Sequence, residues 1–224
     1  MKFISLFFAI LLSISLYSQE TLLRGQGVSL TSIGSLSIEK AAEGDIKGSA
    51  YFNENFLSAD IINFPTSYPM RYNAYLDEME YEVDGLLYNL DKLQHSIVEF
   101  QGVKKKYVST TYYDGKNYVN GFLVELYSGD NYSLYKREKI EFVAATEAKT
   151  TMDMGTDAFY KPLKDMYFIK LKDQSVVDIP KSRKRFVNLL GEDSAKVEDY
   201  IKKNKIDLTN EDSLKLLLAY MDRM

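Results

Sequence analysis

The chain has 224 residues, of which 46% are hydrophobic and 27% charged, the balance of a folded domain rather than of a disordered chain. Its formal net charge of -4 gives no basic footprint for nucleic acid, and the absence of cysteine excludes disulfides, thiolate metal sites and cysteine nucleophiles. It contains 18 tyrosines and 12 phenylalanines but no tryptophan, and a tyrosine excess suits half-buried sheet surfaces.

The amino terminus has the pattern of a secretory signal peptide. Lys2 supplies a positive charge, the apolar core from Phe3 to Leu16 is broken only by serines, and Tyr17-Ser18-Gln19 places a small residue at a cleavage point. The apolar run is shorter than the roughly 20 residues that span a bilayer, which disfavours the alternative of a retained membrane anchor. We therefore expect residues 1–18 to be removed and the mature chain to be exported, to the periplasm, the outer-membrane surface or the extracellular space.

The first part of the mature chain predicts short β segments. Residues 19–43 hold glycines among alternating apolar and small residues, which is typical of an edge strand or an extended arm. Strand-like segments follow between Gly48 and Pro69. Because proline cannot donate to a sheet ladder, Pro65 and Pro69 predict a loop or an edge rather than a central strand.

Carboxylates alternate with apolar residues between residues 78 and 84. A strand places successive side chains on opposite faces, so the acids share one face and the apolar residues the other. The first interpretation is a solvated acidic face, on which alanine at Glu80 or Glu82 would leave stability nearly unchanged. Weak calcium binding and an acid–base carboxylate pair are the alternatives, although the sequence has no Asp-rich calcium loop. The acids are Glu78, Glu80, Glu82 and Asp84, and the apolar residues are Met79, Tyr81 and Val83.

The stretch from Lys105 to Val143 predicts a meander of antiparallel strands. Its tyrosine, valine, threonine, phenylalanine and leucine residues favour strands, and Asp-Gly and Asn-Gly pairs favour tight turns because they tolerate positive φ angles. We place turns at Asp114-Gly115, Asn120-Gly121 and Gly129-Asp130-Asn131. Two short strands are expected before it, between Leu86 and Phe100.

After the meander, residues 147–157 lack periodicity and are predicted to form a flexible loop. Residues 164–179 predict a further hairpin with its turn near Asp173-Gln174. The clusters Lys104-Lys105-Lys106 and Arg183-Lys184-Arg185 are short, and we interpret each as part of a solvated face.

Three short helices are predicted after Pro180. The first spans Arg183–Leu190, with Ser182 as N-cap candidate and Gly191 ending it. Ser194 and Thr209 are the cap candidates of the second and third helices. The third has apolar residues at i, i+3, i+4 and i+7, which must pack on the sheet or on the other helices because this segment is too small for a core of its own. These residues are Leu214, Leu217, Leu218 and Met221.

Three parts of the sequence carry a family resemblance. The predicted signal peptide that ends before Gln19, the stretch RYNAYLDEMEY (Arg71–Tyr81), and the tail from Lys181 through YIKKNKIDLTNEDSLKLLLAYM resemble exported β-rich proteins of unknown function that are common in Bacteroidota. The resemblance covers most of the mature chain. It implies a β-rich body, a Lys-rich helical C-terminal tail and a periplasmic or surface location, and it carries over no functional residues.

The sequence offers little for catalysis. His95 is the only histidine, so a Ser-His-Asp triad would need that residue, and no Gly-x-Ser-x-Gly nucleophile elbow is present. A catalytic zinc ion usually takes two or three histidine ligands. We therefore expect no catalytic, cofactor-binding or metal-binding residues and no cofactor.

Tyrosines of the central meander are the candidate binding residues. Exposed tyrosines in register form a surface for a glycan or a protein partner, because each ring offers a large contact area at low entropic cost. The alternative, which we favour, is that they are core and cross-strand residues of the sheet. The candidates are Tyr107, Tyr113, Tyr118, Tyr127 and Tyr135.

Together these patterns predict a mainly β (α+β) fold. A twisted antiparallel sheet of residues 19–180 would form a sandwich or a partial barrel, with a short C-terminal helical segment, residues 181–224, docking on it. The function they favour is that of an exported, non-enzymatic cell-envelope binding or structural protein, whose partner is another envelope protein, a glycan or a lipid. The alternative is a carrier of a lipid or other apolar ligand with a half-barrel fold. We expect no nucleic-acid partner and no membrane span after signal removal.

Overall fold

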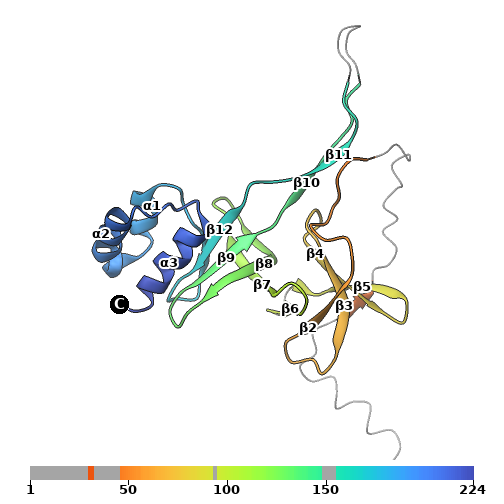
Figure 1. Cartoon of the computed structure of the whole chain (residues 1–224), viewed down its shortest axis with the longest axis horizontal. Coiled ribbons are helices and arrows are strands. Elements are labelled where there is room, and N and C mark those ends of the chain that lie inside the picture. Colours follow the sequence, from red (N-terminus) through yellow and green to blue (C-terminus); the bar gives the residue numbers. More distant parts are fainter. Residues whose placement is uncertain (1–29, 33–45, 93–94, 148–154) are drawn as a thin grey trace, which may run out of the picture.

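The computed structural model of the chain describes residues 30–32, 46–92, 95–147 and 155–224 (Figure 1). Strands make up 43% and helices 18% of the structure, which confirms the predicted mainly β class with a short helical C-terminus. The predicted signal peptide lies outside the described residues and stays a prediction. No helix in the described ranges is long and apolar enough to cross a membrane.

In the described residues, a twisted sheet of 11 strands forms the body of the protein, in the spatial order β1-β5-β4-β3-β2-β6-β7-β13-β12-β9-β8. Figure 1 shows β2–β5 at one end of the molecule and the helices at the other, with β7, β8, β9 and β12 between them. The strands are β1 (Leu30–Ser32), β2 (Leu57–Ile61), β3 (Ser67–Asn73), β4 (Glu78–Val83), β5 (Leu86–Leu90), β6 (Ile97–Phe100), β7 (Lys105–Tyr113), β8 (Tyr118–Ser128), β9 (Ser133–Arg137), β12 (Met166–Lys170) and β13 (Val176–Asp178).

Five strands of this sheet curl into a small barrel. β7 pairs with β8, β8 with β9, β9 with β12 and β12 with β13, and β13 returns to β7 through the parallel pair Val177–Tyr113. This parallel pair makes the sheet mixed, whereas the sequence predicted an antiparallel one, and the predicted partial barrel is confirmed. One buried side chain from each strand fills the interior: Tyr112, Leu123, Tyr135, Phe168 and Val176.

A second core lies where the sheet curves from β2 to β8. Buried side chains from β2, β3, β4, β6, β7 and β8 meet there, and the rings of Tyr72 and Tyr107 pack with centroids 4.8 Å apart. The prediction that Pro69 marks a loop or an edge is wrong, because β3 lies between β2 and β4. Pro69 pairs only with Ser58 of β2, and the ladder to β4 begins at Met70, so the missing N–H of Pro69 interrupts no β4 pairing.

The Asn120-Gly121 pair is not a turn but lies inside β8. Asp77, in the β3–β4 turn, accepts hydrogen bonds from the hydroxyl of Tyr72 at 2.7 Å and from the backbone N–H of Phe122 at 3.1 Å. A Cβ on Gly121 would collide with this carboxylate. The absence of a side chain at Gly121 therefore allows the β3–β4 turn to approach β8 closely, and such close approaches are a common reason for glycine within a strand. The two remaining predicted turns, at Asp114-Gly115 and Gly129-Asp130-Asn131, do connect strands.

A two-stranded ribbon projects from the body (Figure 1). β10 (Ile140–Val143) pairs with β11 (Phe159–Pro162), and the Thr146–Thr156 bridge extends the ribbon into the segment predicted as a flexible loop. Residues 148–154 of that segment lie outside the described residues. The rings of Tyr75, Phe142 and Tyr160 pack together at the base of the ribbon, with centroids 5.1 to 6.4 Å apart.

The C-terminal segment packs on β8, β9 and β12. It contains α1 (Arg183–Asn188), the short 3-10 helix η2 (Gly191–Asp193), α2 (Ser194–Asn204) and α3 (Glu211–Met221). The predicted stripe of α3 is confirmed, since all four residues are buried in a core with Leu134 and Ile169 of the sheet. Two capping predictions are corrected. Asn210, not Thr209, caps α3 by accepting the backbone N–H of Ser213 at 2.9 Å, and α2 begins at Ser194 itself, with Asp193 at its N-cap position.

The carboxylate of Asp222 joins the end of α3 to the β8–β9 turn. It accepts hydrogen bonds from the hydroxyl of Tyr127 at 2.7 Å and from the backbone N–H groups of Asn131 and Tyr132 at 2.9 and 3.1 Å. A Cβ on Gly129 would collide with this carboxylate, so the glycine of the turn is required by the docked helix.

Replacing Asp222 with alanine is expected to lower the free energy of unfolding by about 2 kcal/mol, because three donors lose a charged acceptor. Urea unfolding followed by circular dichroism would measure the change. Asp212→Ala is the matched control, since Asp212 is an exposed acid of the same helix and its loss should change stability by less than about 0.5 kcal/mol. Equal stabilities of the two variants would contradict the role assigned to Asp222.

Candidate functional site

The acidic face of β4 is only partly solvated. Met79 and Tyr81 are buried on the opposite face, as the alternation predicts, and Glu82 is exposed. Glu80, however, is only 5% exposed. The solvated-face interpretation is therefore wrong at Glu80, and so is the expectation that its replacement would leave stability unchanged.

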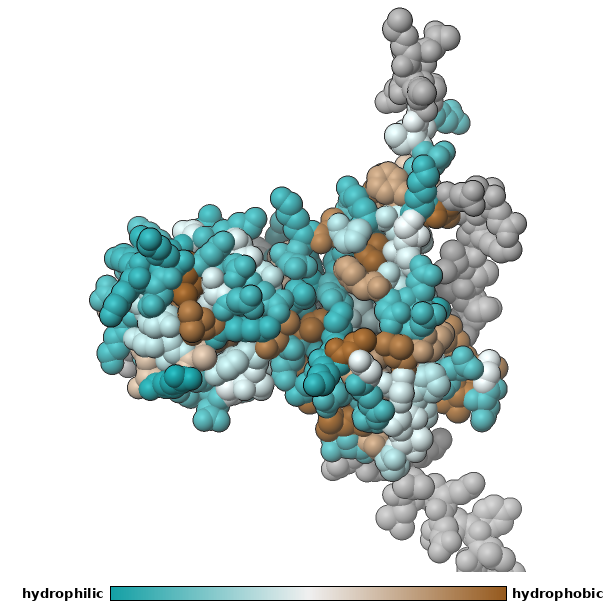
Figure 2. Space-filling model, viewed as in Figure 1, coloured by the Kyte–Doolittle hydropathy of each residue, from teal (hydrophilic) through white to brown (hydrophobic). Residues whose placement is uncertain are grey.

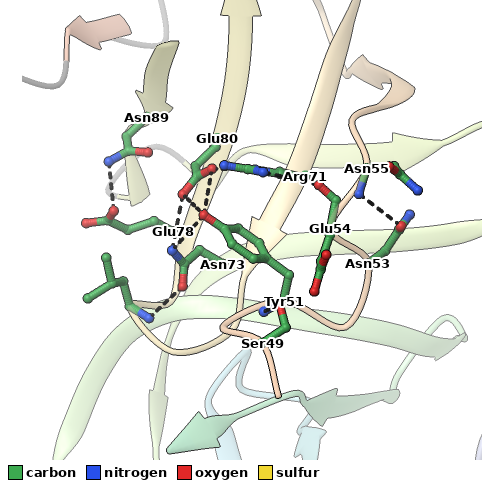
Figure 3. Close-up of polar contacts among 11 residues, drawn as sticks. Ser49, Tyr51, Asn53, Glu54, Asn55, Arg71, Asn73, Glu78, Glu80 and Asn89 are labelled. Carbon is green, nitrogen blue, oxygen red and sulfur yellow. Dashed lines mark hydrogen bonds and ion pairs between the residues drawn. The ribbon is translucent and has the colours of Figure 1, made fainter. Parts of the chain in front are cut away.

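Glu80 is the centre of a polar cluster that ties the segment before β2 to the sheet (Figure 3). It pairs with Arg71, its cross-strand neighbour on β3, at 2.7 Å from Nε to Oε2. It also accepts hydrogen bonds from the hydroxyl of Tyr51 at 2.9 Å and from the amide of Asn73 at 3.1 Å. The guanidinium of Arg71 lies over the rings of Tyr51 and Phe56, 4.2 and 4.5 Å from their centroids.

This arrangement is structural rather than catalytic. Both oxygens of Glu80 face donors of the protein itself, which leaves neither for a substrate. Burial, reinforced by the charge of Glu80 and the hydrogen bond to it, raises the pKa of Tyr51 to about 12, so its phenol stays protonated near neutral pH. A general base and a general acid both need a pKa close to the working pH.

Alkaline pH is expected to unfold the protein as its buried tyrosines ionise. Burial raises the pKa of both Tyr51 and Tyr81 from 10.0 to about 12, and it also raises the pKa of Tyr72 and of Tyr107 well above the ordinary value. Because the folded values exceed the unfolded one, this contribution to stability is complete below pH 10 and is lost as the pH rises toward 12 and beyond.

Phenolate absorbance and circular dichroism, recorded in one pH titration, test this expectation. Part of the phenolate signal should appear only together with the loss of β structure. Complete ionisation of all 18 tyrosines with the β signal intact would contradict it.

The five candidate tyrosines do not form one surface. Tyr107 and Tyr135 are buried, the first in the sheet core and the second in the barrel, so neither offers a ring face to a partner. Tyr127 is half-buried and engaged by Asp222. Only Tyr113 and Tyr118 meet, with ring centroids 5.3 Å apart across the β7–β8 hairpin, and Tyr118 is 78% exposed.

An apolar groove of about 110 Å³ opens between the segment before β2 and the strands β3, β6 and β7. Phe52 and Val103 at its mouth are 47% and 54% exposed, and Figure 2 shows other hydrophobic side chains on this half of the molecule. Its two cations, Arg71 and Lys105, are already paired with the buried carboxylates of Glu80 and Glu138. The groove has room for one side chain rather than for a lipid acyl chain, since ligand sites usually measure about 300 Å³ or more.

A wider cleft lies at the junction of the sheet and the helices. We call it the junction cleft. It measures about 590 Å³ and lies between the start of β12, the connection from β13 to α1, and the loop before α3. Its apolar lining includes Met166, Tyr167, Pro180 and Leu208, and its polar lining includes Lys164, Asp165, Asp178, Lys181, Ser182, Arg185 and Thr209. The sequence did not predict this site. The only feature of the sequence that could have indicated it was the basic cluster that begins at Arg183.

His95 lies before β6 at a φ angle of +48° and is exposed. Within the described ranges, no three His, Cys, Asp or Glu side chains gather where they could hold a metal ion. Searches of protein-family models, curated proteins and solved structures found no match to this chain.

Proposed function

We propose that the protein is an exported, non-enzymatic binding protein of the cell envelope that holds its ligand in the junction cleft. The single observation that carries this proposal is the composition of that cleft. It combines an apolar lining with a few polar and charged groups in about 590 Å³, which is the usual character of a small-molecule site.

The buried carboxylates of the sheet support a binding role over a catalytic one. Glu80 is engaged by Arg71, Tyr51 and Asn73, and Glu138 accepts hydrogen bonds from Lys105 at 2.8 Å and from the hydroxyl of Tyr107 at 2.6 Å. Each of these acids is paired with a cation of the protein itself, and the two do not face a common substrate site. Export and envelope location are supported only by the pattern of residues 1–18 and by the resemblance of the sequence.

The carrier of an apolar ligand is the less favoured function. A half-barrel carrier needs an apolar cavity of about 300 Å³ or more. The curve of the sheet is instead occupied by its own buried side chains, among them Tyr72, Tyr107 and Phe122, and the apolar groove beside them measures only about 110 Å³.

Capture from an envelope extract tests the proposed function. The purified chain is immobilised, incubated with the extract and washed, and the retained material is identified by native mass spectrometry. We expect one discrete ligand that the soluble folded chain displaces and the heat-denatured chain does not. If nothing is displaced by the folded chain, the binding function is wrong.

A further inference from the structure

We propose that the ligand of the junction cleft carries a phosphate group. This inference rests on the proposed function, because it names the chemistry of the ligand that the cleft would hold. The inference goes beyond the proposed function because it assigns recognition of the ligand to three cations from two separate segments of the chain. These are Lys164, Lys181 and Arg185.

These three cations have no directly bonded partner in the described part of the chain. All three are exposed, and none forms a hydrogen bond or an ion pair with another described residue. The cations beside the apolar groove differ, since Arg71 pairs with Glu80 at 2.7 Å and Lys105 with Glu138 at 2.8 Å. Lys164 and Lys181 are therefore available to a ligand, and Arg185 interacts with the carboxylate of Asp178 through its charge but forms no ion pair with it, whereas the cations of the groove are neutralised within the protein.

Carboxylates oppose these cations only in part. Asp165 and Asp178 line the junction cleft; burial raises the pKa of Asp178, and the positive charge of Arg185 acts against that rise. A second hollow of about 390 Å³ adjoins the cleft and shares Lys181 and Leu208 with it. The two together present six cations and three carboxylates, and two of these cations, Arg183 and Lys202, are paired with Glu198 at 3.8 and 2.8 Å. The cations are Lys164, Lys181, Arg183, Arg185, Lys202 and Lys205, and the carboxylates are Asp165, Asp178 and Asp207.

A phosphate group suits this combination better than a carboxylate does. It carries about -1.5 to -2 charges near neutral pH and offers three strong acceptor oxygens. Arginine and lysine side chains are the usual partners of such groups, and the hydroxyl of Ser182 adds a neutral donor beside them. The apolar lining at Met166, Tyr167 and Pro180 would contact the organic part of the ligand.

Charge reversal at the three cations tests the proposal. The variant Lys164→Glu/Lys181→Glu/Arg185→Glu is compared with Lys104→Glu/Lys116→Glu/Lys196→Glu, which makes the same change of net charge at exposed positions outside the cleft. The probes are pyrophosphate, glycerol 3-phosphate, and phosphatidylcholine vesicles with and without phosphatidylglycerol. Titration calorimetry measures the soluble probes, and co-sedimentation measures the vesicles.

We expect the unaltered chain to bind at least one phosphate probe, more weakly at high salt. The cleft variant should bind it at least about tenfold more weakly, and the control variant should bind as the unaltered chain does. Binding of soluble phosphates would identify a soluble ligand, and binding only of phosphatidylglycerol vesicles would identify a lipid headgroup. Lys181→Gln alone, which changes one exposed side chain, should weaken binding in the same direction if the triple variant does not fold.

Two results would overturn the proposal: no binding of any phosphate probe, or equal binding by the cleft and control variants. The capture experiment separates this failure from failure of the proposed function. If the envelope ligand is retained equally by the unaltered chain and by the cleft variant, the phosphate assignment is wrong and the binding function stands. If neither retains a ligand, the binding function is wrong as well.

Discussion

Replacing Glu80 with alanine is expected to lower the free energy of unfolding by about 3 kcal/mol, because removing one partner of a buried ion pair leaves the other charge without compensation. Arg71 would lose its ion pair at 2.7 Å, and Tyr51 and Asn73 would lose their common acceptor. The segment before β2 should then separate from the sheet more readily. The stacking of Arg71 on Tyr51 and Phe56 remains and keeps the loss near the lower end of its usual range.

Two variants control for the change at Glu80. Glu82→Ala removes a carboxylate from the same strand face at an exposed position, and it should change stability by less than about 0.5 kcal/mol. Glu80→Gln keeps the shape and one acceptor but not the charge, so its stability should fall between the other two. Urea unfolding gives all three values, and the midpoint of thermal unfolding of Glu80→Ala should fall by about 6 to 12 °C. Equal stabilities of Glu80→Ala and Glu82→Ala would show that the cluster does not stabilise the fold.

The case of Glu80 shows what alternation along a strand can and cannot predict. Period two correctly placed Met79 and Tyr81 on one face and the acids on the other, because that follows from strand geometry alone. The burial of Glu80 depends on Tyr51, which lies 29 residues away in the sequence and folds over the outer face of β3 and β4. No local pattern encodes that contact. The same alternation of acidic and apolar residues is therefore compatible with an acidic face that another segment covers and with one that is exposed to solvent.

The tyrosines were ambiguous for a related reason. β7 contributes Tyr107 to the sheet core and Tyr112 to the barrel interior, so both of its faces are covered. The covering depends on closure through the Val177–Tyr113 pair, between strands that are far apart in the sequence. The junction cleft is likewise assembled by docking, because Lys164 and Arg185 lie on different segments and Leu208 follows α2. The basic cluster at Arg183 therefore predicts only a solvated surface when the sequence around it is considered without the docked segments.

Replacing Phe168 with alanine is expected to have the largest effect, a loss of about 4 kcal/mol in the free energy of unfolding. Phe168 is fully buried at the centre of the barrel and packs edge-on against Tyr112, with ring centroids 4.7 Å apart. The interior holds one buried side chain from each of five strands, so the neighbours have little freedom to fill the vacated volume. Because β12 also contributes Ile169 to the core beneath the helices, the damage should reach the helical end as well.

Phe142→Ala also removes a phenylalanine ring, but from a half-buried position on the β10–β11 ribbon. It should lower the free energy of unfolding by about 1 kcal/mol. Calorimetric unfolding of the two variants gives the comparison, and the helical signal in circular dichroism shows whether the C-terminal segment unfolds together with the barrel. If Phe168→Ala costs no more than Phe142→Ala, the five strands do not enclose a packed interior. If the helices of Phe168→Ala unfold separately from the barrel and at an unchanged temperature, the barrel does not support their docking. The junction cleft between the sheet and the helices would then not depend on the packing of the barrel.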